Sequence, residues 1–178
     1  MNRGRCYHSS CYIASNIYTF CGLTEKNNNN SVEKLPINNQ GAEQSWQLML
    51  IKNVPSRLNA VVSPLNNNKI LIAGGVNNEY QMLDDVYIYD IESGFCTKSV
   101  IQKPYSFDCE GNSSTYVDEN KVVALVRDKK HRPKLIEFQD YQNSLTVSVI
   151  RDFYTSNTSS SPRGFATSWW SFKRYLAD

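Results

Sequence analysis

The 178-residue sequence predicts an all-β fold built from repeated four-stranded antiparallel sheets. Short apolar segments recur along the chain at a period of about 50 residues, which is typical of propeller blades. Aromatic residues make up 12% of the chain, and 11 of them are tyrosines, which favour strands together with β-branched residues. No segment has the apolar stripe of an amphipathic helix.

The clearest repeat unit lies in the middle of the chain. Residues 69–75 form a short apolar segment that ends in a glycine pair, and residues 84–90 alternate in the way that a strand of a sheet does. The pattern recurs on both sides at about the same spacing. Residues 16–22 are an apolar segment that also ends in glycine, and residues 121–126 repeat the apolar segment without the glycines.

Each unit is predicted to contain four strands. A single four-stranded sheet would expose two faces and two edges, and radial stacking of several such sheets covers them, as in a β-propeller. The predicted strands are residues 7–13, 16–22, 31–37 and 46–51 in the first unit, 58–63, 69–75, 86–90 and 95–101 in the second, and 113–117, 121–126, 134–138 and 145–150 in the third.

The repeat also sets the expected domain organisation. Residues 3–170 are predicted to form one propeller-like array with units of roughly 3–51, 52–102 and 103–151. The start of a fourth unit follows at 160–170, with a C-terminal tail at 171–178. Closed propellers have about 4–8 blades, so we expect an incomplete ring. Its open blade edges predict self-association.

At these repeated positions the chain resembles the Kelch-repeat family of β-propellers. The second unit has the family's glycine pair after an apolar strand, a tyrosine further along and Phe95 near the position of the family's tryptophan. The third unit has residues 126–127, Val-Arg, in place of the glycines. The resemblance assigns five structural positions to the Kelch motif: Gly22, Trp46, Gly74, Gly75 and Tyr89.

The resemblance also implies where a partner would bind. In Kelch propellers that bind peptides, arginines in the loop before the first strand of a blade face the central pocket. Arg57 matches that position, as do Arg5 and Arg163, and Tyr105 lies in the matching loop of the third unit. An arginine fork there would pair with a carboxylate or phosphate, so the partner is expected to be acidic. The alternative is that each arginine braces its own blade through a local aspartate or carbonyl group.

The favoured function is a non-catalytic module that binds another protein or a peptide through propeller loops, without a cofactor or a metal. The net charge of +2 is too small to indicate nucleic acid or a membrane surface as the partner. No apolar segment of about 18 residues predicts a membrane-spanning helix. Five cysteines without a CxxC pair, and no apolar signal segment, predict reduced thiols in a cytoplasmic protein.

Two other functions stay open. One is a Kelch-fold enzyme of the oxidase or sugar-isomerase type. The two histidines, His8 and His131, lie in different units and have no metal-binding spacing, which disfavours such a site. The acidic pair at residues 84–85 is read as a turn before a strand, although it could also serve acid–base chemistry. The other is a structural role, or a remnant fragment of a larger Kelch protein.

Overall fold

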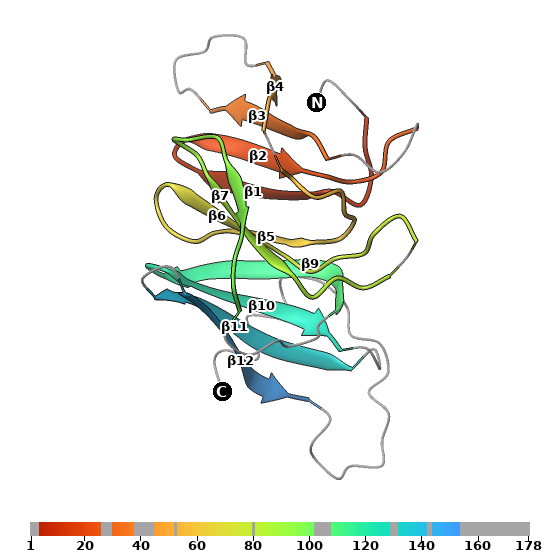
Figure 1. The fold of residues 1–178 in the computed structure, drawn as a ribbon, viewed down its shortest axis with the longest axis vertical. Coiled ribbons are helices and arrows are strands. Elements are labelled where there is room, and N and C mark those ends of the chain that lie inside the picture. Colours follow the sequence, from red (N-terminus) through yellow and green to blue (C-terminus); the bar gives the residue numbers. More distant parts are fainter. Residues whose placement is uncertain are drawn as a thin grey trace.

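Three four-stranded antiparallel sheets, stacked one on the next, make up the fold (Figure 1). We call them sheets 1, 2 and 3 in chain order. The predicted all-β fold is confirmed, and the described ranges contain no helix and hence none that could cross a membrane. The computed structural model describes residues 4–25, 30–37, 45–51, 53–79, 81–101, 108–128, 132–141 and 144–153.

Sheet 1 is a meander in which each strand pairs with the next along the chain. Its first hairpin turns through Ala14 and Ser15, which both have positive φ (48° and 58°). A two-residue turn with this backbone conformation matches the twist of the flanking strands. The cross-strand pairs run from Ser9 with Phe20 to Ile13 with Asn16. The strands are β1 (Ser9–Ile13), β2 (Asn16–Phe20), β3 (Val32–Pro36) and β4 (Gln47–Met49).

Sheet 2 has the same order and carries the most apolar strand of the molecule. In β6 the side chains alternate between the two faces of the sheet, and both faces are buried, so the strand is apolar at nearly every position. The last hairpin is closed by Asp90, whose Oδ1 accepts bonds of 2.8 Å from both the N–H and the hydroxyl of Ser93. The strands are β5 (Val61–Pro64), β6 (Lys69–Ala73), β7 (Val86–Asp90) and β8 (Cys96–Lys98).

Sheet 3 has longer strands than the sequence predicts. Its first strand was expected at residues 113–117 and instead runs over eleven residues, because pairing continues as far as Arg127 opposite Asp108. No glycine pair ends the ladder here, and pairing continues further along the hairpin, with register shifts between Lys121 and Val122 and between Leu125 and Arg127. The strands are β9 (Asp108–Asp118), β10 (Lys121–Arg127), β11 (Pro133–Tyr141) and β12 (Ser144–Asp152).

Two hydrophobic cores hold the sheets together. The core between sheets 1 and 2 contains Tyr18, Phe20 and Tyr89, and the core between sheets 2 and 3 contains Leu71 and Phe138. Strand β5 lies between β1 and β9 and contacts both, so the three first strands run side by side. The candidate site described below lies on the surface formed by β1, β5 and β9.

Two glycines that follow the second strand of a sheet allow the chain to pack closely against the segment that leads into the first strand. Gly75 has φ of 89°, and a Cβ there would lie 2.4 Å from the carbonyl oxygen of Leu58. Gly22 has φ of 93°, and its Cβ would lie 2.8 Å from the carbonyl oxygen of Cys6. Only glycine combines this backbone conformation with this approach, which explains why the apolar strands of sheets 1 and 2 end in glycine.

The predicted limits of the domain and its units, residues 3–170 with boundaries near 51 and 102, stay predictions. The described sheets lie within residues 9–49, 61–98 and 108–152. The expected start of a fourth unit at 160–170 and the tail at 171–178 lie outside the described residues.

Candidate binding groove

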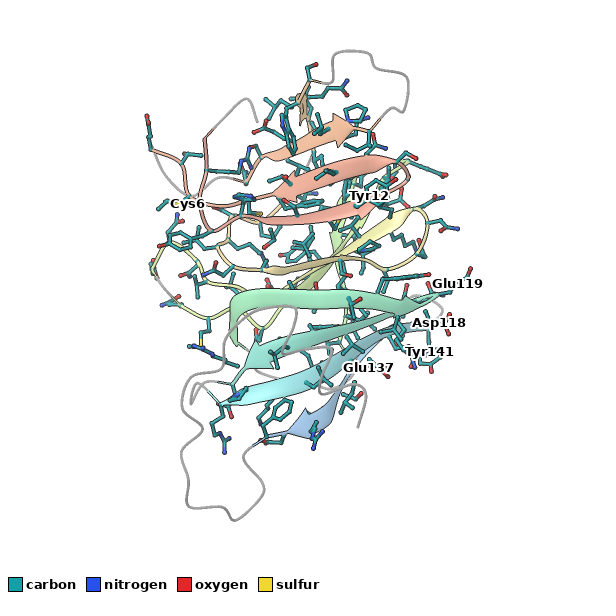
Figure 2. All side chains as sticks on the ribbon, turned by 180° about the vertical axis from the view of Figure 1, so that it is seen from behind. Cys6, Tyr12, Asp118, Glu119, Glu137 and Tyr141 are labelled. Atoms are coloured by element: carbon teal, nitrogen blue, oxygen red, sulfur yellow. The ribbon has the colours of Figure 1, made fainter. Side chains whose placement is uncertain are left out.

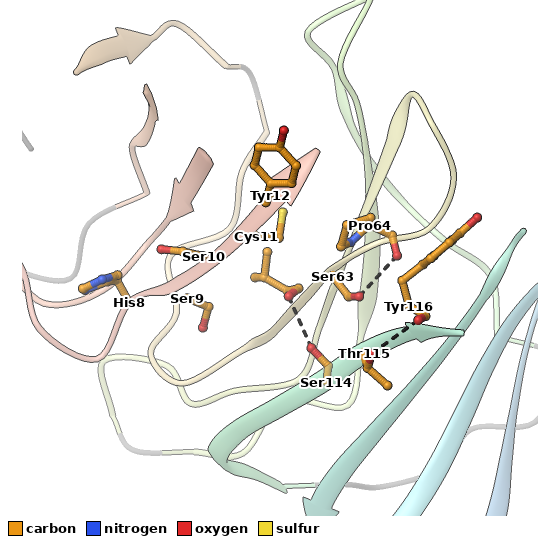
Figure 3. Close-up of a pocket in the computed structure, with 11 residues that line it drawn as sticks. His8, Ser9, Ser10, Cys11, Tyr12, Ser63, Pro64, Ser114, Thr115 and Tyr116 are labelled. Carbon is orange, nitrogen blue, oxygen red and sulfur yellow. Dashed lines mark hydrogen bonds between the residues drawn. The ribbon is translucent and has the colours of Figure 1, made fainter. Parts of the chain in front are cut away.

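A groove of about 640 Å³ lies where the three first strands converge (Figure 3). Its volume falls within the roughly 300–1,000 Å³ of typical ligand pockets. Hydroxyl, thiol and aromatic side chains dominate the lining, and the described residues that line it include no lysine, arginine or carboxylate. The lining residues are His8, Ser9, Ser10, Cys11 and Tyr12 from sheet 1, Val62, Ser63 and Pro64 from sheet 2, and Ser114, Thr115 and Tyr116 from sheet 3.

Serine side chains from both neighbours bond to the inner edge of sheet 2. Ser9 Oγ donates to the carbonyl of Ala60 at 2.6 Å, and Ser114 Oγ donates to the carbonyl of Val62 at 3.3 Å. An unpaired strand edge is normally a template for another extended chain. Here two alternate carbonyls of that edge already have donors, so a ligand in the groove would be recognised mainly through side chains.

Two tyrosines stand on opposite walls of the groove (Figure 3). Tyr12 is 59% exposed and Tyr116 is 40% exposed, and Pro64 lies between them on β5. The three residues occupy matching positions, since each pairs with the second residue of the next strand in its own sheet. Exposed tyrosines offer a flat apolar face and a hydroxyl, a combination enriched at binding hot spots.

The groove also contains Cys11 and His8, whose environments do not favour covalent chemistry. Burial raises the pKa of the Cys11 thiol to about 12, so this thiol is protonated at neutral pH and is a weak nucleophile. The Nδ1 atom of His8 is buried and has no hydrogen-bond partner among the described residues. Within those residues, no three His, Cys, Asp or Glu side chains gather as metal ligands would.

Arg57, the residue that best matches the family's pocket position, points into the protein. Its side chain is fully buried. Its Nη1 donates to the carbonyl of Gly74 at 2.7 Å and lies 3.0 Å from Oδ1 of Asp85. The guanidinium also stacks over Tyr87, 5.1 Å from the ring centroid. Arg57 therefore ties the entry of sheet 2 to the glycine turn and to the start of β7.

Arg5 makes the same arrangement in sheet 1. Its Nη1 donates to the carbonyls of Cys21 at 2.9 Å and Ser31 at 3.1 Å, and Nη2 pairs with the carboxylate of Glu33. The side chains of both partners in this ion pair are completely buried. Such contacts are expected if each arginine stabilises its own sheet through a local carboxylate or carbonyl group.

Contact of Arg5 or Arg57 with a partner stays a prediction, and it would require a sheet to open around a buried ion pair. The other two residues expected at the partner site, Tyr105 and Arg163, lie outside the described residues.

The remaining motif residues have structural surroundings. Tyr89 is fully buried and packs its ring against Phe20 at 5.7 Å and Tyr18 at 6.2 Å between centroids. Burial raises the pKa of its phenol to about 12. Trp46 is half-buried immediately before β4, and the backbone N–H of Gly74 donates to the carbonyl of Asp85 at 3.0 Å.

His8 was weighed from the sequence as a possible metal ligand, but the two tyrosines of the groove were not singled out, although one signal was available. Tyr12 and Tyr116 stand in the first predicted strands of the first and third units, and each follows a run of small polar residues. A comparison of the units position by position would have aligned these tyrosines. That both line one groove depends on the packing of β1, β5 and β9.

Comparison with known proteins supports the architecture. The sequence matches none of the protein-family models and none of the curated proteins with which it was compared. The structure is similar to that of YjhT, a Kelch-repeat propeller protein, with a TM-score of 0.64 and 14% sequence identity. The three sheets resemble propeller blades. The match covers 85% of this chain and 53% of YjhT, so the chain spans about half the length of that protein. At this identity the likeness shows the fold alone.

Proposed function

We propose that this chain is a Kelch-type propeller module that binds another protein or a peptide without catalysing a reaction. The groove between β1, β5 and β9 is the proposed binding surface. The observation that supports it best is the pair Tyr12 and Tyr116, exposed on opposite walls of a groove whose other described lining residues are mostly serine, threonine and cysteine. The recurring glycine, tyrosine and arginine positions support membership of the Kelch family.

The geometry of the groove suits a segment of polypeptide. Tyrosine anchors supply contact area at a low cost in conformational entropy, and energetic hot spots in interfaces are enriched in such residues. Thr115 lines the groove between the tyrosines, and its hydroxyl, which donates to the carbonyl of Tyr116 at 3.3 Å, can still accept a hydrogen bond from a ligand. The bound segment would therefore place two side chains against the tyrosines.

A peptide-display selection on the purified chain tests this proposal. Selected peptides should bind the unaltered chain and lose at least about tenfold in affinity to the double variant Tyr12→Ala/Tyr116→Ala, since a hot-spot residue contributes about 2 kcal/mol or more. Phe95→Ala is the matched control, because Phe95 is 51% exposed immediately before β8 and is not among the described residues that line the groove.

Selected peptides that bind both variants equally would place binding elsewhere and contradict the groove. Failure to select any peptide, with a chain that unfolds cooperatively, would contradict the binding function. The cytoplasmic location expected from the cysteine content belongs to the same proposal.

Self-association through open sheet edges is a further part of the proposal. Light scattering across a range of concentrations would show a mass that rises above 20.4 kDa as concentration increases. A constant mass of 20.4 kDa at every concentration would contradict self-association and leave partner binding unaffected.

A further inference from the structure

We propose that the partner segment that occupies the groove is basic, carrying a lysine or arginine that the groove receives between its tyrosines and a neighbouring acidic turn. This inference rests on the proposed function and specifies the chemistry of the partner. It reverses the partner charge expected from the sequence, which relied on arginines facing a pocket.

Two exposed carboxylates follow the groove residue Tyr116 closely in the chain. Asp118 and Glu119 form the turn between β9 and β10, two and three positions after Tyr116, and both are exposed. Figure 2 shows them at the tip of this hairpin, with Tyr141 and Glu137 close by. Neither carboxylate forms an ion pair with another described residue, and Asp118 Oδ1 accepts only the N–H of Glu119 at 2.7 Å. Their charge is therefore available to a ligand.

The cations that could cancel this charge have acidic neighbours of their own. Lys121 Nζ lies 3.4 Å from Oε2 of Glu137, and Lys69 stands opposite Asp90 on the neighbouring strand. Two of the three arginines that the sequence placed at the pocket, Arg5 and Arg57, are buried against Glu33 and Asp85, and the third, Arg163, lies outside the described residues. Although the whole chain has a net charge of +2, the described residues leave two exposed carboxylates without an ion pair at this end of the groove.

The acidic turn is held in position by the neighbouring sheet. Asn66 Nδ2 donates to Oδ1 of Asn120 at 3.2 Å, and the N–H of Asn120 donates to the carbonyl of Leu65 at 2.8 Å. The carbonyl of Asn120 in turn accepts the N–H of Asp140 at 2.9 Å. These bonds join the turns of sheets 2 and 3, so the two carboxylates are preorganised beside the groove.

Recognition of a cation follows from these elements. The serine bonds to the inner edge of β5 leave recognition largely to side chains. A lysine or arginine can stack on an exposed tyrosine ring, a contact worth about 0.5–1 kcal/mol at exposed sites. Its charged end can then pair with Asp118 or Glu119. An acidic segment would gain neither contact and would be repelled by the turn.

The test uses two short fluorescein-labelled peptides of equal length, one repeating Ser-Lys-Leu and the other Ser-Glu-Leu. Binding to the full chain is measured by fluorescence anisotropy at low and at high salt. We expect the lysine peptide to bind at least about tenfold more tightly, and the difference to shrink with salt as screening increases.

Two charge variants test whether the preference for the lysine peptide comes from the acidic turn. Asp118→Asn/Glu119→Gln should weaken binding of the lysine peptide roughly five- to tenfold, since each exposed pair contributes about 0.2–1 kcal/mol. The matched control Glu79→Gln/Asp84→Asn removes the same charge from exposed positions in the β6–β7 loop and should change affinity less than about twofold. The thermal midpoint of each variant confirms folding.

Three results would overturn the inference. They are equal or tighter binding of the glutamate peptide, equal losses in both charge variants, and no loss in Asp118→Asn/Glu119→Gln. If display yields acidic or neutral peptides that depend on Tyr12 and Tyr116, the groove function stands and the basic partner is wrong. If no peptide of any charge binds, the proposed function itself fails.

Discussion

Sheets 2 and 3 reach the same four-stranded arrangement by different means. In sheet 2 the ladder between β5 and β6 ends at a glycine turn, and the buried Arg57 fastens that turn to Asp85. In sheet 3 there is no glycine pair, and the ladder between β9 and β10 continues to Arg127. The loop that follows is held by an ionic cluster in which Asp128 pairs with Arg132 and Lys134.

The two sheets therefore share the same strand pairing, although the residues at the turn after their second strand differ. The device in sheet 2 buries a guanidinium whose Nε and Nη2 have no hydrogen-bond partner among the described residues, so it depends on the few contacts that Nη1 makes. The device in sheet 3 leaves Arg132 37% exposed and gives the buried Asp128 a second cationic partner, Lys134, so the loss of one pair there costs less. Sheet 2 should therefore be much more sensitive to substitution at the turn than sheet 3.

The largest effect is expected for Arg57→Met. It removes the donor to the carbonyl of Gly74 and leaves Lys98, 3.9 Å away, as the remaining cationic neighbour of Asp85 among the described residues, and breaking a buried pair costs about 3–5 kcal/mol. Arg132→Met removes the same groups from a side chain that is 37% exposed and should cost less than about 1 kcal/mol. Urea denaturation measures both. Similar losses for the two variants would remove the distinction between the sheets.

Gly75→Ala should follow, with a loss of roughly 2–4 kcal/mol from a positive φ and a clash with the backbone of Leu58. Gly94→Ala is the control, because Gly94 also has positive φ (70°) but has no atom near its missing Cβ. Its loss should be about 1 kcal/mol. Thermal unfolding would compare the two, and an equal shift in midpoint would show that the close approach of Leu58 is not limiting.

Alkaline pH should weaken the junction between sheets 1 and 2 selectively. Burial raises the pKa of Cys21 to about 11 and of Cys96 to about 12. An unfolded chain ionises these thiols near pH 9, whereas the folded chain keeps them protonated. Their stabilisation is complete below pH 9 and is lost as pH rises toward 11–12, by about 1.4 kcal/mol per pH unit for each thiol.

Urea denaturation at pH 8 and pH 10 measures this loss, and Cys96→Ala should reduce the slope of stability with pH. An unchanged slope would mean that the Cys96 thiol is not shielded from water. The core between sheets 2 and 3 contains no cysteine among its described side chains, so it serves as the internal reference.

The smallest effect is expected for Tyr89→Phe. The hydroxyl of Tyr89 is buried and has no hydrogen-bond partner among the described residues, so its removal should leave stability within about 0.5 kcal/mol or raise it. Sheet 3 already has Phe138 at the matching position, opposite the second residue of β10. A loss above about 1 kcal/mol in calorimetry would instead reveal a partner for the Tyr89 hydroxyl.

Strand positions were predictable where the side chains alternate. Residues 86–90 were expected to form a strand because apolar and aromatic residues alternate there, and β7 has those bounds. Strand β9 begins earlier than expected because residues 108–112 are mostly polar, and nothing local marks them as a strand. Their pairing with β10 is imposed by the partner strand, so a pattern search along the chain missed it.

The site was much less predictable than the fold. From the sequence, Arg57 could face a pocket or brace its own sheet, because the direction of a side chain in a loop depends on residues far along the chain. The groove likewise depends on contacts between residues that are far apart in the sequence. Ser9 meets Ala60 only because β1 and β5 pack side by side, and no local property of Ser9 indicates that contact.

Strand β6 belongs to both cores at once. Ile70 and Ile72 pack toward sheet 1, Leu71 and Ala73 pack toward sheet 3, and all four are 0% exposed. A structure that opens locally should fray from the outer sheets inward, since neither junction can be lost without exposing one face of this strand. The amide hydrogens of β6 should then be the last in the protein to exchange with solvent, and their rate would report global unfolding.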